Sequence, residues 1–426
     1  MTEFGGADEK ISLKLLAKHC VDACVRGCKE IRAVAKRNKR VMDDDGNFAM
    51  KKEKIKHTFK DENDARSALT EADVNAQSVI IGALRKSYGE RLNIVGEEDG
   101  DANAKPREDE EKLRDDCFEF SKMEEVEDVE VRVGDCVVFV DPVDGTREFI
   151  EERYQNCQCL IGIAHKGRAV VGVVGIPFPK GKITKDCDVE ALAVVYGMCY
   201  EKEDEGGTVV RVLETCNETL LGNAAAAATT NALAETTKTK TTKTPTTNQQ
   251  QQQKKQRVSS ETTTPSSPYI LTTGDSKSKA LRAAVEVVEE CIRDDNAYPT
   301  PPERLITGGA GNKILRVATG ISPSSSSSQQ TPPTTTPNDP SKQTKNAPPD
   351  CALMHMGTCA WDTAAPEAVL RVHRAADQPH RLPKELLGRG VAPGLDHDPG
   401  ALVPRKHRFP RPREESVARL LRCAKL

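Results

Sequence analysis

Residues 135–146, with the sequence DCVVFVDPVDGT, constrain the fold more than any other stretch of this chain. Their apolar, β-branched run is stopped by a proline and a glycine, a pattern typical of a buried strand that ends in a tight turn. Asp141, Asp144 and the main-chain carbonyl of Val143 can then converge on one point, which suits an oxygen-seeking cation such as Mg²⁺. The alternative interpretation is an Asx-type turn that caps the next helix.

Hydrophobic spacing predicts helices and strands on both sides of this turn. Apolar residues recur at helical spacing in two N-terminal segments, and the second of these begins with a Thr-x-x-Asp capping pattern. The predicted apolar stripes are Leu13, Leu16, Cys20, Cys24, Ile31 and Ala35 in the first segment, and Val74, Val79, Ile80 and Leu84 in the second. Shorter apolar runs bounded by turn residues are typical of strands. The expected helices cover 11–35, 70–86, 278–292 and a segment opened by the Gly-rich turn at 308–313, and the expected strands cover 92–99, 135–146, 158–165, 169–176 and 269–275.

The length of 426 residues exceeds that of one ordinary domain, so two structural units, or one large unit with insertions, are expected. We expect an N-terminal α+β half at 1–185 and a C-terminal α/β half at 186–370. Two low-complexity segments, 223–268 and 322–349, have too few apolar residues to offset the entropy of ordering, and we expect disordered insertions there. Residues 371–426 form a basic, Pro-rich tail with a poor supply of core residues.

Composition excludes some function classes. The net charge of −3 gives no global field that favours a nucleic acid polymer or a membrane. The amino terminus lacks the basic and apolar regions of a secretory signal, and apolar stretches fall short of the ~20 residues of a spanning helix. The sequence therefore predicts a soluble, cytoplasmic protein that binds any anionic ligand locally.

The cysteines are numerous but scattered, without the paired CxxC sets of structural zinc sites. Cys20, Cys24 and Cys28 recur every four residues, which predicts one buried face of a helix, with a metal or redox cluster as the alternative. Cys157 and Cys159 share one face of a predicted strand. We expect all of them to be reduced thiols.

Three further acidic positions lie far from the Asp-Pro turn in the chain. Glu97 ends a separate predicted strand, Asp362 lies where a helix can begin, and Asp73 is the fourth residue of the capping pattern. Taken alone, Asp362 and Asp73 are also consistent with helix capping. Together with the Asp-Pro turn, these carboxylates have the composition of a cage for two or three divalent ions.

The segments TEAD at 70–73, GEED at 96–99, DPVDGTREF at 141–149, GGAGNK at 308–313 and WDTAAPEAVL at 361–370 resemble the inositol monophosphatase superfamily in type and order. More narrowly, they resemble 3'(2'),5'-bisphosphate nucleotidases, which remove the 3'-phosphate from adenosine 3',5'-bisphosphate. The resemblance covers roughly 11–215 and 269–370, and the residues after Leu370 do not share it. It implies an α/β (α+β) fold, the layered α/β/α/β/α sandwich of the sugar phosphatases.

The resemblance also implies roles for individual residues. Magnesium, two or three ions per site, would be held by Glu97, Asp141, Asp144, Asp362 and the carbonyl of Val143. The pair Asp73 and Thr146 would activate the attacking water, since a threonine hydroxyl can relay a proton to a carboxylate. The implied substrate contacts are Gly145, Thr146, Ser276, Lys277, Ser278, Gly309 and Lys313, with Lys277 standing where the family often has His.

The implied function is a lithium-sensitive, Mg²⁺-dependent phosphomonoesterase acting on a small phosphorylated metabolite. Arg147 and Glu148 follow the DGT sequence where inositol monophosphatases more often carry Thr-Asn, which favours a nucleotide substrate. One alternative is an inositol phosphate phosphatase. The other is a catalytically inactive scaffold of the same fold, with partners bound through its Gln- and Thr-rich insertions.

Overall fold

The computed structural model describes 9–38, 55–59, 68–98, 111–183, 192–201, 209–217, 269–275, 279–294, 302–319, 349, 351–354, 358–374 and 402–404. The two predicted insertions, apart from Pro349, and most of the predicted tail lie outside these residues. The elements are β1 Lys10–Ser12, α1 Leu13–Asn38, β2 His57–Phe59, β3 Ala68–Thr70, α2 Glu71–Tyr88, β4 Asn93–Gly96, α3 Ser121–Glu125, β5 Glu130–Arg132, β6 Cys136–Asp144, α4 Thr146–Ile150, β7 Gln158–His165, β8 Arg168–Ile176, β9 Ala193–Glu201, β10 Val209–Cys216, β11 Ile270–Thr273, α6 Lys279–Asp294, β12 Glu303–Ile306, α7 Ala310–Thr319, β13 Cys351–Leu353, α8 Ala360–Arg374 and β14 Leu402–Pro404.

A six-stranded sheet in the order β10-β9-β8-β7-β6-β4 forms the centre of the molecule. Its neighbours are antiparallel except for β4 and β6, which run parallel and so bring their carboxyl ends to the same edge. The expected boundary after residue 185 falls between β8 and β9. These strands pair from Val171 with Met198 to Ile176 with Ala193, so the sheet continues through Cys216.

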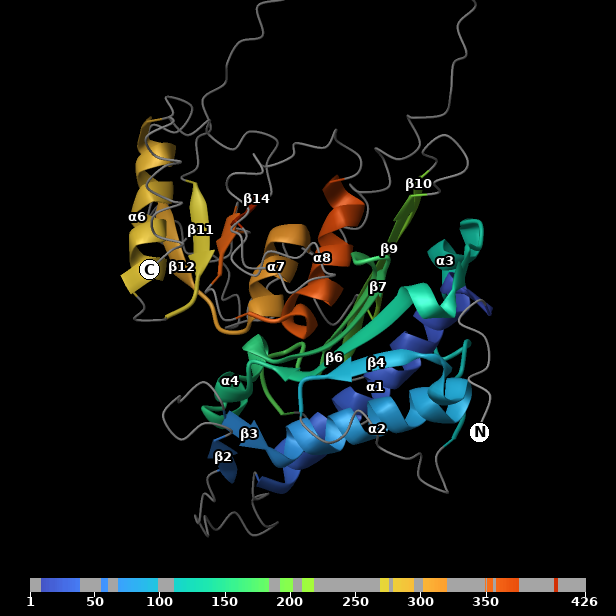
Figure 1. Ribbon diagram of the computed structural model, residues 1–426. Coiled ribbons are helices and arrows are strands. Elements are labelled where there is room, and N and C mark those ends of the chain that lie inside the picture. Colours follow the sequence, from blue (N-terminus) through green and yellow to red (C-terminus); the bar gives the residue numbers. More distant parts are fainter. Residues whose placement is uncertain are drawn as a thin grey trace, which may run out of the picture.

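Helices cover both faces of this sheet, as Figure 1 shows. On one face α1 packs against β7 and β8, and α2 packs against β6; on the other face α8 crosses β6 to β10 with α7 beside it. The predicted stripe of α1 is fully buried: Leu13, Leu16, Cys20, Cys24, Ile31 and Ala35 are each 0% exposed. Full burial of a leucine or isoleucine side chain, as at Leu13, Leu16 and Ile31, contributes about 1.5–3 kcal/mol relative to exposure.

The α8 helix approaches the sheet closely because β7, β8 and β9 carry glycine beneath it, at Gly162, Gly172 and Gly197. A Cβ on Gly172 of β8 would lie 1.9 Å from the carbonyl oxygen of Ala365, and a Cβ on Gly162 of β7 would lie 2.6 Å from the Ala364 side chain. Only a residue without a side chain fits at these two positions. This contact fixes the start of α8 over the end of β6.

A second sheet, in the order β12-β11-β13-β14, lies beyond α7 (Figure 1). The α6 helix covers its other face through Leu281, Val285 and Val288, which pack against Leu271 of β11 and Leu353 of β13. The layers therefore run α1/α2, sheet, α7/α8, sheet, α6, which confirms the expected α/β/α/β/α sandwich. The β14 strand lies within the predicted tail and pairs with β13 as an edge strand.

Most of the predicted elements are confirmed within a few residues. The α2 helix has the predicted capping box of Thr70 and Asp73, and β7 covers the predicted 158–165. The β7–β8 turn places both Lys166 and Gly167 at positive φ, as a tight hairpin requires. The prediction of a buried stripe on α2 was wrong for Val74, which is 40% exposed because it lies on the outer side of the helix. Within the described residues, no helix combines the length and the apolar character that a membrane span needs.

Candidate functional site

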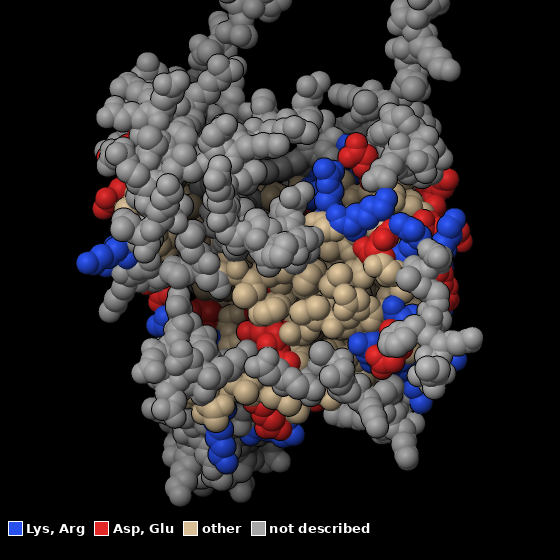
Figure 2. Space-filling model, in the orientation of Figure 1, with Lys and Arg blue, Asp and Glu red and all other residues tan. Residues whose placement is uncertain are grey.

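Three aspartates from two separate elements form what we call the carboxylate cluster: Asp141 and Asp144 at the end of β6, and Asp362 in the first turn of α8. One carboxylate oxygen of each lies within 4.8 Å of those of the other two. The β6–β7 pairing shifts register between Asp141 and Asp144, so both side chains turn to one side. Figure 2 shows acidic side chains near the place where Figure 1 shows β6 passing to α4.

Asp141 is the most deeply buried member of the carboxylate cluster. It is 1% exposed, and its Oδ1 atom has no hydrogen-bond partner among the described residues. Burial raises the pKa of Asp141 well above its ordinary value, and the charges of Glu97, Asp144 and Asp362 raise it further. A buried, unpartnered carboxylate oxygen beside two other carboxylates is costly alone and is satisfied by a hard cation. The residues present therefore fit Mg²⁺.

Asp144 joins the sheet to the start of α7. Its Oδ1 accepts the Ala310 N–H at 2.8 Å and its Oδ2 accepts the Asn312 N–H at 3.2 Å. Gly309, at φ +73, permits this approach, since a Cβ there would lie 2.6 Å from Oδ2. Burial raises the pKa of Asp144 to about 6, although Lys313 and the two N–H donors oppose that rise.

Asp362 combines the two interpretations that the sequence left open. Its Oδ2 accepts the N–H of Cys359 at the start of α8, as a helix-capping carboxylate does. Its other neighbours are the remaining members of the carboxylate cluster. Burial raises the pKa of Asp362 to about 7, and the charge of Asp144 adds to the effect.

Glu97 follows β4 and lies beside Asp141, because β4 and β6 end at the same edge of the sheet. Its N–H donates to the carbonyl of Val140 at 3.0 Å. The Gln77 side chain of α2 fixes the next residue: its Nε2 donates to the Glu98 carbonyl at 2.9 Å, and its Oε1 accepts the Glu98 N–H at 3.0 Å. Gln77 is thus the residue that positions the acidic segment.

Thr146 lies between Asp73 and the Val143 carbonyl. Its Oγ1 is 2.9 Å from Oδ1 of Asp73 and 3.1 Å from the carbonyl oxygen of Val143, so its one proton is donated to either acceptor. The second oxygen of Asp73 accepts the N–H of Thr70 at 2.8 Å in the capping box. Burial raises the pKa of Asp73 to about 6. Asp73 therefore both caps α2 and accepts a hydrogen bond from Thr146.

The predicted substrate contacts divide into two groups. Gly145, at φ +87, is the residue before α4, and Gly309 and Lys313 lie beside Asp144 at the start of α7. The Lys313 ammonium donates to the Gly309 carbonyl at 2.7 Å, and burial lowers its pKa. Two first-turn N–H groups of α7, those of Ala310 and Asn312, donate to Asp144. Ser276, Lys277 and Ser278 lie outside the described residues.

Several polar residues beside this site were not among the predicted site residues. Glu148 of α4 accepts hydrogen bonds from Arg153 at 2.8 Å and Asn156 at 2.6 Å, and Asn156 in turn accepts from Asn312 at 3.2 Å. Gln158, opposite Asp144 in the β6–β7 pairing, is 1% exposed. In the sequence, Gln158 differs from its neighbours only as a polar residue at the start of an otherwise apolar strand.

The raised pKa values predict how the stability of the metal-free protein depends on pH. Asp144, at about 6, and Asp362, at about 7, bind protons more tightly when folded than when unfolded, where the value is near 3.8. Their favourable contribution is complete below pH ~4 and is lost as pH rises to ~7. Metal-free protein is therefore expected to melt at a lower temperature at pH 8 than at pH 5.5.

Added Mg²⁺ is expected to stabilise the protein more at pH 8 than at pH 5.5, because the ion requires deprotonated carboxylates. Calorimetry with and without Mg²⁺ at both pH values measures the difference. In Asp362→Asn the pH slope of the metal-free melting temperature becomes shallower. An unchanged slope in that variant contradicts the prediction.

Comparison with known proteins places these observations in a family. The model of the inositol monophosphatase family matches residues 16–321. A segment of 116 residues is 37% identical to 3'(2'),5'-bisphosphate nucleotidase 1 of Rattus norvegicus and 34% identical to that of Homo sapiens, covering 26% of this chain and 35% of each relative. The matched segment thus spans about a third of the length of these curated relatives.

Two further similarities concern a shorter segment and a solved structure. A segment of 54 residues is 44% identical to a putative inositol monophosphatase 3 of Drosophila pseudoobscura pseudoobscura, covering 13% of this chain and 15% of the relative. Among solved structures, the extragenic suppressor protein suhB of Bartonella henselae aligns with a TM-score of 0.42 and 12% identity over 84% of both chains.

Proposed function

Because the chain belongs to the inositol monophosphatase family, we propose that it is a Mg²⁺-dependent phosphomonoesterase that removes the 3'-phosphate from adenosine 3',5'-bisphosphate. The observation that carries the proposal is the carboxylate cluster, with an unpartnered buried oxygen on Asp141, placed beside the Asp73–Thr146 pair. Carboxylates that would hold a hard cation and a carboxylate–hydroxyl pair that would move a proton are the two requirements of metal-assisted hydrolysis.

Glu97, Asp141, Asp144, Asp362 and the Val143 carbonyl would hold the ions. When bound, Mg²⁺ would supply positive charge to the phosphoryl oxygens and favour ionisation of the attacking water. The proposed reaction requires no covalent intermediate with the protein, because water and not a side chain is the nucleophile.

Thr146 and Asp73 would take up the proton of the attacking water. As the Thr146 hydroxyl accepts a proton from water, it passes its own to Oδ1 of Asp73 over 2.9 Å. The pKa of about 6 for Asp73, raised by burial, makes it a base that is ionised at pH 7 yet close enough to neutrality to accept a proton. Its bonds to Thr70 keep the carboxylate in place.

The nucleotide substrate is supported by the names of the curated relatives and by Arg147. This residue follows the DGT sequence and donates to Asp275 at 2.8 Å, so it connects α4 to the segment that precedes Ser276. A guanidinium at that junction adds positive charge close to where a second phosphate group would enter. Arg147 also pairs with Glu151 at 2.8 Å, which limits its movement.

Phosphate release from adenosine 3',5'-bisphosphate by the purified chain tests the proposal, with inositol 1-phosphate assayed in parallel at several Mg²⁺ concentrations. We expect the nucleotide to be hydrolysed with the higher kcat/KM and no reaction when the ions are chelated. A preference for the inositol substrate would assign the chain to the inositol phosphatases. No release from either substrate at any Mg²⁺ concentration would favour an inactive scaffold.

A further inference from the structure

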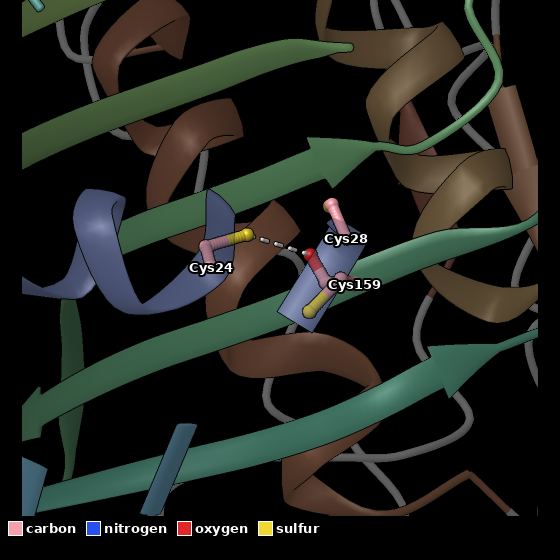
Figure 3. Close-up of side chains that lie close together, drawn as sticks. All are labelled: Cys24, Cys28 and Cys159. Carbon is pink, nitrogen blue, oxygen red and sulfur yellow. Dashed lines mark hydrogen bonds between the residues drawn. The ribbon is translucent and has the colours of Figure 1, made fainter. Parts of the chain in front are cut away.

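Three cysteines bring their sulfur atoms together in the core, between α1 and the central sheet. Cys24 and Cys28 lie one turn apart on α1, and Cys159 is the second residue of β7 (Figure 3). Their Sγ atoms all lie within 4.8 Å of one another, and each residue is 0% exposed. We call them the cysteine cluster.

The packing around the cysteine cluster leaves room for sulfur. Gly175 of β8 pairs with Cys159 across the sheet, and a Cβ there would lie 2.5 Å from the Cys28 sulfur and 2.6 Å from the Cys24 sulfur. A Cβ on Gly27 would lie 3.2 Å from the Cys159 sulfur. Glycine on both the helix and the neighbouring strand is therefore what allows three sulfur atoms to converge.

The three cysteines interact closely with one another. The Cys24 thiol donates to the carbonyl oxygen of Cys159 at 3.5 Å, as the dashed line in Figure 3 marks. Hydrogen bonds with Cys159 and then Cys28 lower the pKa of Cys24 to about 5, despite its burial. Burial raises the pKa of Cys28 well above its ordinary value, and the charge of Arg32, which is 2% exposed and one turn beyond Cys28, opposes that rise.

The number and type of these ligands select among metal ions. An ion bound in one plane by three sulfurs at ~2.3 Å requires sulfur atoms ~4 Å apart. The three Sγ atoms of the cysteine cluster lie within 4.8 Å of one another, which is compatible with that separation. Structural zinc takes four protein ligands. Among the described residues, the cysteine cluster offers three, with no fourth His, Cys, Asp or Glu in the group. Soft thiolates select Cu(I), which accepts three of them and needs no water.

We propose that Cys24, Cys28 and Cys159 form a trigonal binding site for Cu(I), separate from the carboxylate cluster. Each Cu–S bond that forms at a thiol replaces an S–H bond, and the proton leaves to solvent. The metal enters as Cu(I), so no electron is transferred and no oxidant is needed. The site links α1 to β7 through the bound ion.

The test uses the full chain, purified without oxygen and mixed with Cu(I) supplied as its acetonitrile complex. A Cu(I) chelator in excess removes ions from the other thiols, including the exposed Cys359 and the half-buried Cys117. We expect one ion per chain to resist the chelator, with X-ray absorption fitted by three sulfur neighbours at ~2.3 Å. The bound ion is also expected to raise the melting temperature.

Matched alanine variants assign the ligands. Cys28→Ala and Cys159→Ala are expected to lose the retained ion and the rise in melting temperature. Cys20→Ala, which changes an equally buried cysteine one turn before Cys24 on the same helix face, is expected to keep both. Circular dichroism confirms that each variant is folded.

Three outcomes would overturn the assignment. The first is that folded wild-type protein loses all copper to the chelator. The second is that folded Cys159→Ala and Cys28→Ala retain as much copper as Cys20→Ala. The third is that the retained ion is Zn²⁺ with four neighbours when both metals are offered.

Discussion

Replacing Asp141 by Asn is expected to reduce phosphate release by at least ~10³-fold. Loss of one carboxylate ligand removes several kcal/mol of charge stabilisation, and each 1.4 kcal/mol corresponds to a tenfold change in rate. The same variant is expected to be more stable than wild type without metal, by about 1 kcal/mol. The reason is that burial and the charges of Glu97, Asp144 and Asp362 disfavour the ionised form of Asp141.

Opposite signs for activity and stability separate this prediction from simple damage to the fold. Initial rates with adenosine 3',5'-bisphosphate measure the first effect, and melting temperatures in chelator measure the second. Asp135→Asn is the matched control at the other end of β6, where the carboxylate pairs with exposed Arg132 at 2.9 Å and contributes little. A metal-free Asp141→Asn protein that melts below wild type would contradict the account of charge repulsion.

Replacing Thr146 by Val is expected to lower kcat by ~10²–10⁴-fold, the range attributed to a positioned proton-transfer group. Valine keeps the branched shape at the start of α4 but removes the hydroxyl that contacts Asp73 at 2.9 Å and Val143 at 3.1 Å. Stabilisation by Mg²⁺ is expected to persist, because the acidic side chains of the proposed metal site are unchanged. Thr146→Ser, which retains the hydroxyl, is expected to keep most of the activity.

The pH profile identifies the role of the pair. Wild-type activity is expected to fall as pH drops below ~6, because Asp73, with its pKa raised by burial to about 6, becomes protonated and cannot accept a proton. Thr146→Val is expected to weaken this acid limb as well as the rate. A Thr146→Val enzyme with wild-type kcat would remove Thr146 from the proton path and leave it a structural contact of Asp73.

Several local contacts hold acidic residues of the site in place. Two backbone N–H groups of α7 hold Asp144, Thr70 and Thr146 hold Asp73, and Gln77 holds the backbone at Glu98. Each contact satisfies a buried polar group that would otherwise be unpaired. The site is thus preorganised by contacts from α2 and its capping residue, α4 and α7, and ion binding is expected to relieve the repulsion that remains.

Local pattern was sufficient for most of the elements. A 3.6-residue period predicts α1 and α2, and an apolar run bounded by turn residues predicts β6, β7 and β8, because those signals depend on neighbours a few residues away. The capping box of Thr70 and Asp73 could be predicted for the same reason, since its two residues are three positions apart. Sheet membership was not: β9 and β10 extend the first sheet past residue 185 through pairing with β8, which is a long-range hydrogen-bond pattern.

The sequence by itself determined which acidic and thiol side chains were available, in which order, and on which kind of element each would lie. Only the tertiary structure decided which of them meet. Asp144 engages α7 some 166 residues later, and Cys159 joins Cys24 and Cys28 rather than a partner in its own strand. The physical reason is that such meetings depend on how closely layers pack, and here glycines at 172, 175 and 309 set that spacing from positions remote in the chain.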